Sequence, residues 1–352
     1  MEDYQIQPQL MRWLMRSYSS ESVRRVPNIP VALGTDIGAV RKENQDRAVV
    51  LRAQTTPNKF FVVAVLCDGM GGMEAGATCA ALATSSFLAS CVKNRKIATR
   101  ERLVAAVIDA NNAVYENYHG DGGATLSAFI IDNTGEKLAV NVGDSRIYTS
   151  EGKDLEQISV DDTIAGQLEK RENASSLDSK LLQFVGIGPD IEPHILELPN
   201  SLELSRILLT SDGAHSLNFD SFNSLITQAA EPEVLLKRLL ITSRWCGGSD
   251  NATGILFKDI IQLNNNGHDF HSGTVLLWDP YGELQLIGID RQASMEPQKT
   301  EDEAESKAPE TPEEQHKQQN TKESEKPSKK RGRRSSKETK KKPQLRIDFN
   351  DD

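Results

Sequence analysis

Five aspartates of this chain stand where carboxylates could do chemistry. Each lies at the end of a predicted strand or in a turn and has small or polar neighbours: Asp46, Asp68, Asp144, Asp212 and Asp250. An Asp-Gly pair taken alone is typical of a plain turn. The apolar strands predicted before Asp68 and Asp212 favour a functional interpretation, because such strands direct carboxylates out of the edge of a buried sheet.

A convergent set of such carboxylates would need compensation. At about 5 Å separation and an effective dielectric of about 20, two ionised carboxylates repel by roughly 3 kcal/mol. A cluster therefore takes up protons or binds cations, and oxygen ligands select hard divalent ions, Mg²⁺ or Mn²⁺, over zinc. In the run Cys67-Asp68-Gly69-Met70-Gly71-Gly72 the glycines would let backbone approach a metal, and the Gly69 carbonyl could ligate one.

The elements that must position these residues come in blocks. Apolar stretches predict strands over 60–66, 125–131, 137–142, 146–149, 206–210 and 252–257, and helical spacing predicts helices over 74–92, 100–118, 219–230 and 233–245. Short turns join most neighbouring strands, which favours an antiparallel α+β sandwich over a doubly wound parallel sheet. The polar segment 151–180 is predicted to be a mobile flap with some helix. A hairpin is expected over 272–289, around Asp279-Pro280-Tyr281-Gly282.

The two ends of the chain differ from this pattern. Residues 1–29 are a polar lead-in with one amphipathic patch at 10–14, interpreted as a helix packed on the body or, alternatively, as a partner-docking element. Residues 296–326 hold ten acids and five bases, and residues 329–342 hold nine Lys or Arg and one Glu. Neither block can bury enough surface to offset its ordering entropy, so both are predicted to be disordered. The closing stretch 345–349 could be a docking peptide.

Overall composition excludes several classes of protein. The net charge of −10 argues against a globally basic nucleic-acid binder. The basic run 329–342 could still bind nucleic acid or an acidic membrane face, or fold back on acidic parts of the chain. Four widely spaced cysteines are typical of reduced thiols, no apolar run reaches the roughly 20 residues of a membrane span, and no signal peptide is recognised. We therefore expect a cytoplasmic protein.

Six motifs then appear in a familiar order. They are Arg-x4-Asp (Arg41 to Asp46), Asp-Gly-Met-Gly-Gly, Gly-Ala-Thr (123–125), Asn-x-Gly-Asp-Ser-Arg (141–146), Ser-Asp-Gly (211–213) and Asp-Asn-x-Thr (250–253). Any one of them is weak, but six in order within residues 31–258 are specific. The chain resembles the metal-dependent protein phosphatases of type 2C, the PPM family, and its bacterial serine/threonine phosphatases in particular.

This resemblance implies an α+β fold, a four-layer αββα sandwich of two antiparallel sheets flanked by helices. It implies two Mn²⁺ or Mg²⁺ ions bridged by Asp68, with Asp212 and Asp250 completing one site. The Gly69 carbonyl and Asp46, the latter directly or through water, would complete the other. Asp144 matches a carboxylate that helps to hold a third, weaker metal in related bacterial enzymes, and Arg41 would bind the substrate phosphate. A hydroxide shared by the two metals would attack phosphoserine or phosphothreonine in line.

The chain departs from some relatives at the expected proton donor. Met70 stands where some family members have a histidine, and its thioether cannot donate a proton. His194 and His215 are alternative donors, although each is more typical of a structural or exposed residue. Cys67 is interpreted as a packed thiol rather than a nucleophile. The flap carries Asp161-Asp162-Thr163 in place of an Asp-His-Ser-like stretch, which leaves substrate recognition open.

Two functions and four segments follow from the sequence. The main hypothesis is a phosphatase that acts on phosphorylated proteins and opposes a Ser/Thr kinase. The alternative is a catalytically weak phosphoprotein-binding scaffold whose basic tail binds nucleic acid or an acidic partner. The predicted segments are an N-terminal extension (1–29), a type 2C phosphatase domain (30–258), a β-hairpin extension (259–291) and a disordered acidic-then-basic tail (292–352).

Overall fold

A computed structural model describes the part of the chain that carries the predicted site. It covers residues 6–16, 19–56, 58–70, 75–151, 154–167, 180–198, 206–228, 230–258 and 274–287. All of these belong to one of two compact units, Met1–Gln298. The acidic block, the basic run and the closing peptide lie outside the described residues, as do Gly71 and Gly72.

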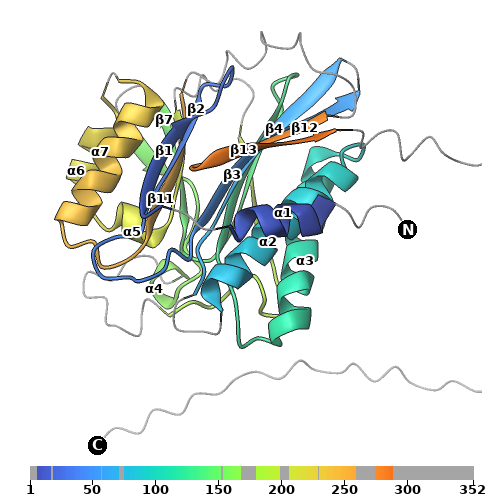
Figure 1. The fold of residues 1–352 in the computed structure, drawn as a ribbon, viewed down its shortest axis with the longest axis horizontal. Coiled ribbons are helices and arrows are strands. Elements are labelled where there is room, and N and C mark those ends of the chain that lie inside the picture. Colours follow the sequence, from blue (N-terminus) through green and yellow to red (C-terminus); the bar gives the residue numbers. More distant parts are fainter. Residues whose placement is uncertain are drawn as a thin grey trace, which may run out of the picture. The chain divides into compact units, whose positions relative to one another are not determined.

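Two antiparallel sheets form the centre of this unit (Figure 1). The six-stranded sheet has the order β1-β2-β11-β10-β7-β8 and the seven-stranded sheet the order β13-β12-β3-β4-β5-β6-β9. The first contains β1 (Glu21–Arg25), β2 (Val31–Asp36), β7 (Arg146–Glu151), β8 (Asp154–Gln157), β10 (Arg206–Thr210) and β11 (Ala252–Lys258). The second contains β3 (Arg47–Thr56), β4 (Lys59–Cys67), β5 (Leu126–Asp132), β6 (Lys137–Val142), β9 (His194–Leu198), β12 (Thr274–Asp279) and β13 (Gly282–Ile287).

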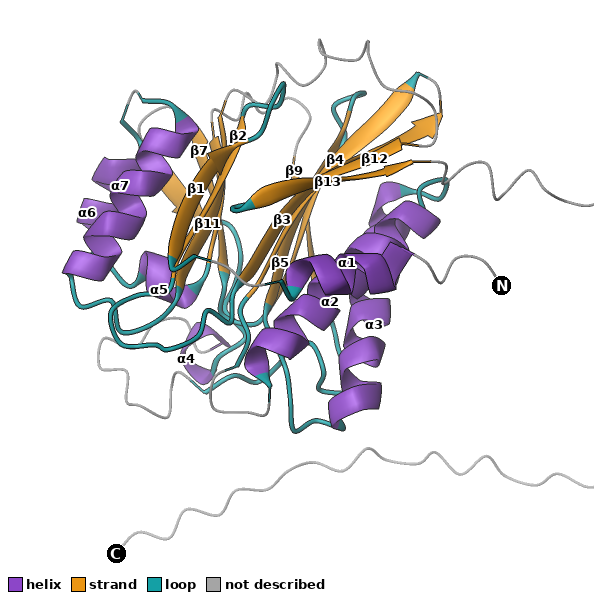
Figure 2. Cartoon of the chain, viewed as in Figure 1, coloured by secondary structure: helices purple, strands orange, loops and turns teal. Residues whose placement is uncertain are grey.

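Helices cover the outer face of each sheet (Figure 2). Beside the seven-stranded sheet lie α1 (Ile6–Leu14), α2 (Gly76–Lys93) and α3 (Thr99–Tyr118). Beside the six-stranded sheet lie α5 (Asp212–His215), α6 (Phe219–Ile226) and α7 (Pro232–Trp245). The short helix α4 (Ile164–Gln167) lies in the segment predicted to be a flap. The order of layers is therefore helix, sheet, sheet, helix, as the resemblance implied.

The burial of β4 shows why this stacking follows from the sequence. Successive side chains of a strand point to opposite faces. Val63 and Val65 enter the core that the seven-stranded sheet shares with α1–α3. Val62 and Ala64 enter the core between the two sheets. A strand buried on both faces needs a continuous apolar run, which is the pattern of residues 60–66.

Most predicted elements are present within a few residues of their expected bounds. The amphipathic patch near the N-terminus forms α1, whose Leu10 and Leu14 are buried in the core, so the interpretation as a packed helix is confirmed. The hairpin expected over 272–289 is formed by β12 and β13, and β12 pairs with β3. No helix within the described ranges is long and apolar enough to cross a membrane.

Five strands were not anticipated from the sequence. Of these, β2 and β3 lie inside the sheets, whereas β1, β8 and β9 stand at sheet edges. The sequences of the three edge strands, ESVRR, DLEQ and HILEL, lack a run that is buried on both faces, because an edge strand has one neighbour and stays partly solvated. The segment from 151 to 180 thus holds β8 as well as the short helix α4.

Candidate active site

The register of the strands gathers the five predicted aspartates at one end of the sandwich. In the seven-stranded sheet Arg47 pairs with Cys67, so Asp46 and Asp68 stand side by side just beyond the pair. In the six-stranded sheet Thr210 pairs with both Arg146 and Gly254. Asp144, Asp212 and Asp250 therefore follow or precede strands at a common edge.

Asp68 is the electrostatic centre of this cluster. Its pKa is raised well above the usual value, first by burial and then by the charges of the other four aspartates, Asp46, Asp212, Asp144 and Asp250. Its backbone is fixed, since its N–H donates to Thr125 Oγ1 at 3.0 Å and its carbonyl accepts from Thr125 N at 2.9 Å. The interactions with all four neighbours show that the structure brings the predicted carboxylates together.

Gly69 is required by the close approach of two other segments. A Cβ atom added at Gly69 would stand 2.2 Å from the carbonyl oxygen of Gly76. Its N–H donates to the Gln45 carbonyl at 3.3 Å, and the next N–H, of Met70, donates to the Gly123 carbonyl at 3.1 Å. The turn that carries Asp68 is therefore enclosed by backbone on both sides.

Asp46 is held from the six-stranded sheet. It is 5% exposed, and its Oδ2 accepts from Ser211 Oγ at 2.8 Å. Burial raises the pKa of Asp46 to about 6, and Asp212 adds to the rise, while the hydroxyls of Thr253 and Ser211 oppose it. Ser211 also accepts from Thr253 N at 2.9 Å, so one serine ties Asp46 to β11. Neither Ser211 nor Thr253 was assigned a role from the sequence, although both lie within the Ser-Asp-Gly and Asp-Asn-x-Thr motifs.

The carboxyl groups of Asp212 and Asp144 also have raised pKa values, because their charges are not compensated. The pKa of Asp212 is raised by burial and then by Asp250. The pKa of Asp144 is raised to about 6 by burial and then by Asp212 and Asp161. Asp144 is thus linked electrostatically to the main cluster through Asp212.

Arg41 binds a carboxylate of the cluster. Its Nη2 donates to Asp250 Oδ2 at 2.6 Å, and the two side chains are 40% and 30% exposed. The hydrogen bond to Asp250 is the largest cause of the raised pKa of Arg41, with Asp212 and Asp68 contributing further. The predicted phosphate ligand thus stands at the mouth of the cluster, paired with one of the predicted metal ligands.

Asn251 organises the loop that carries Arg41, a role that sequence reasoning missed. Its Nδ2 donates to the carbonyls of Ile37 and Glu43 at 2.9 and 3.1 Å, and its Oδ1 accepts from Gln45 N at 2.8 Å. The available signal was its place beside Asp250 in the Asp-Asn-x-Thr motif. One amide side chain therefore fixes both ends of the loop between β2 and β3.

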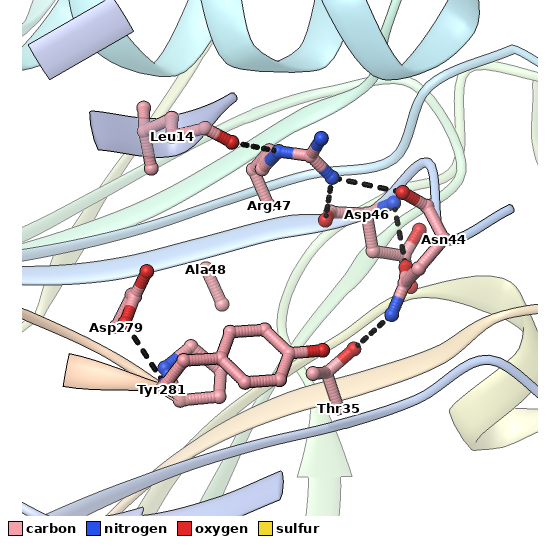
Figure 3. A pocket seen from close by; sticks show the side chains of 9 residues that line it. Leu14, Thr35, Asn44, Asp46, Arg47, Ala48, Asp279 and Tyr281 are labelled. Carbon is pink, nitrogen blue, oxygen red and sulfur yellow. Dashed lines mark hydrogen bonds between the residues drawn. The ribbon is translucent and has the colours of Figure 1, made fainter. Parts of the chain in front are cut away.

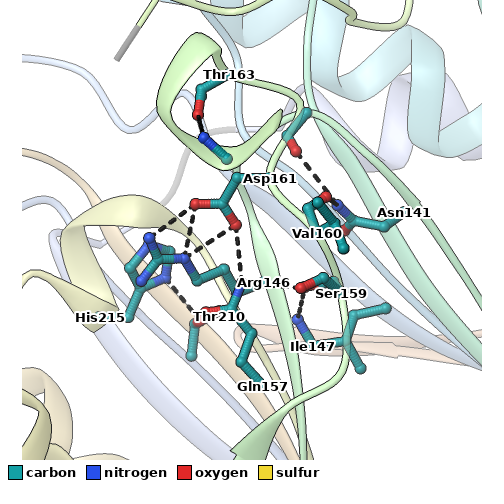
Figure 4. Close-up of polar contacts among 12 residues, drawn as sticks. Asn141, Arg146, Ile147, Gln157, Ser159, Val160, Asp161, Thr163, Thr210 and His215 are labelled. Carbon is teal, nitrogen blue, oxygen red and sulfur yellow. Dashed lines mark hydrogen bonds and ion pairs between the residues drawn. The ribbon is translucent and has the colours of Figure 1, made fainter. Parts of the chain in front are cut away.

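The predicted flap is tied to the cluster by Asp161 and Asp162, and Figure 4 shows the first of these with Arg146. Asp161 binds Arg146 through two guanidinium nitrogens, with the shortest contact at 2.7 Å. Asp162 Oδ2 accepts from Gly143 N at 2.9 Å, directly before Asp144. Both contacts hold the turn that presents Asp144, and neither partner was assigned from the sequence.

Neither histidine proposed as a proton donor stands free. His194 Nε2 lies 2.8 Å from Asp162 Oδ1. His215 Nδ1 lies 2.9 Å from Thr210 Oγ1, and burial and the Arg146 charge lower the pKa of His215 well below its usual value. His215 is therefore neutral at physiological pH. Burial raises the pKa of Cys67 to about 12, so its thiol stays protonated and unreactive, as a packed cysteine should.

The residues present fit hard divalent cations. No three acidic, His or Cys side chains of the described residues stand close enough to form a finished ion site. Yet Oδ1 of Asp46 and Oδ1 of Asp212 are buried, and Asp68 is the neighbour that interacts with both carboxylates. Asp68 carries at most one proton, so it can donate to only one of them. A bound cation would coordinate such buried carboxylate oxygens and would stabilise the ionised form of these groups, whose pKa values are raised.

Comparison with known proteins shows which class of protein shares this two-sheet sandwich. The family model described as Protein phosphatase 2C matches residues 34–239. The protein phosphatase PhpP of Streptococcus pneumoniae is 29% identical over 245 residues, which cover 63% of this chain and 94% of PhpP. The serine/threonine protein phosphatase PstP of Mycobacterium tuberculosis is 28% identical over 245 residues, covering 66% of this chain and 45% of PstP.

Solved structures of serine/threonine phosphatases are also similar to this chain. The crystal structure of the PPM Ser-Thr phosphatase MsPP from Mycobacterium smegmatis, in complex with cacodylate, matches with a TM-score of 0.54 and 28% identity, over 65% of this chain and 97% of MsPP. The structure of PstP/Ppp from M. tuberculosis matches with a TM-score of 0.55 and 25% identity, over 67% and 98% of the two chains. The chain belongs to the protein phosphatase 2C family.

Proposed function

We propose that this chain hydrolyses phosphoserine and phosphothreonine in proteins at a centre of two Mn²⁺ or Mg²⁺ ions built on Asp68. The coarser assignment follows from the family, so the chain is a protein serine/threonine phosphatase. The observation that carries the finer proposal is the buried aspartate cluster. It supports cation binding because Asp68, with at most one proton, cannot satisfy the buried oxygens of both Asp46 and Asp212.

Each aspartate takes the role that its place in the cluster supports. Asp68 interacts with all four others and is proposed as the bridge between the ions. Asp212 and Asp250 would complete one site, and Asp46 with the Gly69 carbonyl the other. Asp144, which is coupled to Asp212, would help to hold a third, weaker ion.

The ions and the protein would contribute different parts of the reaction chemistry. When bound, the ions would acidify a water molecule and neutralise phosphoryl charge. Arg41 would orient the substrate, since its guanidinium offers a planar fork to phosphoryl oxygens. Arg41 pairs with Asp250, so a cation held by Asp250 would compete with this pairing and leave the guanidinium fork to the phosphate. Met70 cannot protonate the leaving oxygen, and Cys67 has no part in the reaction.

The proposal is tested by assaying p-nitrophenyl phosphate and a phosphothreonine peptide with Mn²⁺. Wild type is compared with Asp68→Ala and with Asp109→Ala, a control on the exposed side of α3. We expect Asp68→Ala to lose activity on both substrates and Asp109→Ala to keep it. Equal activity in wild type and Asp68→Ala would remove the basis for the assignment and favour the phosphoprotein-binding scaffold instead.

The cellular setting is proposed from the same function. The substrates would be phosphorylated proteins, with a Ser/Thr kinase acting on the same targets, in the cytoplasm. The basic run 329–342 would bind nucleic acid or an acidic partner. Binding of the full chain to DNA over a range of salt concentrations, compared with a form whose run is neutralised to glutamine, tests that part. Identical binding by the two forms would contradict it.

A further inference from the structure

The backbone around Asp46 is contacted by elements that lie outside the family region, which we define as the residues matched by the family model. The Protein phosphatase 2C model matches residues 34–239, whereas α1 precedes that range and the β12–β13 hairpin follows it. Both reach the segment that leads into Asp46 at the start of β3. Residues of α1, of the hairpin turn and of this segment line a small, partly open cavity of about 10 Å³, which is the space of about one water molecule.

Arg47 joins α1 to the backbone of this segment (Figure 3). Its Nε donates to the carbonyl of Leu14, the last residue of α1, at 3.0 Å. Its Nη1 donates to the carbonyls of Asn44 and Asp46 at 2.9 and 2.8 Å. The side chain is 7% exposed, so the guanidinium is held away from solvent among backbone acceptors. A planar, permanently charged donor in this place fixes the path of residues 44–46 relative to α1.

An ion pair joins the end of α1 to the β12–β13 hairpin. Arg16, just beyond α1, donates from Nη2 to both carboxylate oxygens of Asp279, at 2.8 and 2.7 Å. Asp279 is 2% exposed, and its Oδ1 also accepts from the N–H groups of Tyr281 and Gly282 at 2.9 and 2.7 Å. The same carboxylate therefore closes the hairpin turn and holds the end of α1, although 263 positions separate the two residues.

Further hydrogen bonds connect this segment, through Asn44, to the aspartate cluster. Asn44 Oδ1 accepts from Asp46 N at 3.0 Å, and Asn44 Nδ2 donates to Thr35 Oγ1 at 2.8 Å. Thr35 Oγ1 lies 2.7 Å from Thr253 Oγ1, whose hydroxyl also interacts with the Asp46 carboxylate. Asp46 is thus held by β10 and β11 at its carboxylate and by α1, through Arg47, at its backbone.

We propose that Arg47 is a positioning residue for the metal ligand Asp46, and that the Arg16–Asp279 pair locks Arg47 in place. This inference rests on the proposed function, because it assumes that Asp46 holds a metal. It assigns a role to both flanks of the family region: they set the geometry of one ligand without touching substrate. Partners that orient a metal ligand typically change metal affinity about 10- to 100-fold when they are removed.

The experiment measures Mn²⁺ binding to the chelator-treated full chain by calorimetric titration. The variants are Arg47→Met, Arg16→Met and Asp279→Asn, with Arg100→Met as the matched control. Arg100 also forms an ion pair of 2.6 Å, with Glu197, but on the exposed surface where α3 meets β9. Asp46→Asn is included to establish that Asp46 is a ligand, and thermal melting of each metal-free variant reports folding.

We expect Arg47→Met to raise the Kd for Mn²⁺ about tenfold or more, and Arg16→Met and Asp279→Asn to raise it by a smaller factor. Arg100→Met should bind as wild type does, and kcat at saturating Mn²⁺ should be kept in all three support variants. If Arg47→Met does not fold, the Kd values of Arg16→Met and Asp279→Asn for Mn²⁺ test the inference. A wild-type Kd in the support variants, with only the melting temperature lowered, would overturn the inference and leave a structural role. A wild-type Kd in Asp46→Asn would instead show that the proposed metal site is wrong.

Discussion

Replacing Asp144 by asparagine should stabilise the metal-free protein at neutral pH, although it removes a proposed ligand. Asp144 is partly buried, and its pKa is raised from 3.8 to about 6, first by burial and then by Asp212 and Asp161. A rise of about 2 pKa units corresponds to about 3 kcal/mol. Between these pH values the folded protein keeps a proton that the unfolded chain releases. Stability therefore falls as pH rises through the window from about 4 to 6, and the loss is complete above it.

The assay is urea unfolding in the presence of a chelator, for wild type and Asp144→Asn, at pH 7.5 and at pH 4.5. The variant should gain about 3 kcal/mol at pH 7.5, where the wild-type carboxyl is ionised, and much less at pH 4.5, where the folded protein holds it protonated. Asp109→Asn, an exposed control, should show no such difference. A gain that is absent at pH 7.5, or equal at both pH values, would refute the reasoning that Asp144 bears an uncompensated charge.

Three further changes have expected outcomes. Gly69→Ala should destabilise the fold by about 3 kcal/mol or more, because its Cβ would stand 2.2 Å from the Gly76 carbonyl oxygen; an unchanged urea midpoint would contradict this. A thiol reagent should modify exposed Cys246 in the native protein and leave buried Cys67 intact, and Cys67→Ser should keep phosphatase activity; mass spectrometry and the peptide assay check both. Ser211→Ala should cost about 1–3 kcal/mol, since it removes the donor to Asp46 Oδ2 and the acceptor of Thr253 N; urea unfolding measures it.

Two of the strands that carry the site, β4 and β10, could be predicted because their sequences are unambiguous, whereas β3, which begins directly after Asp46, was not predicted. Residues 60–66 form an apolar run that is buried on both faces, and the chain leaves the sheet directly at Asp68. The strand before Asp212 has the predicted bounds, Arg206–Thr210, and is buried throughout. A carboxylate placed at the end of such a strand has little freedom, so Asp68 and Asp212 could be predicted to leave the edge of a buried sheet.

What supports the cluster could not be foreseen, because it depends on contacts between distant segments. Arg16 and Asp279 are ordinary charged residues in the sequence, and only the folded chain brings them together. Asp161 gave no sign that it would bind Arg146, since the segment around it has no clear period. The pairing of Arg41 with Asp250 is likewise a property of the folded loop. Local patterns report strands and helices, whereas these hydrogen bonds depend on how those elements pack.

A crystal of the full chain soaked in Mn²⁺ and measured for anomalous scattering at the manganese edge tests directly whether Asp68 stands between two metal ions. We expect two peaks at the end of the sandwich where Asp46, Asp68, Asp212 and Asp250 meet, with the Asp68 carboxylate shared between them. Peaks that do not contact Asp68, or no peak at this cluster under Mn²⁺ concentrations that support activity, would contradict this expectation.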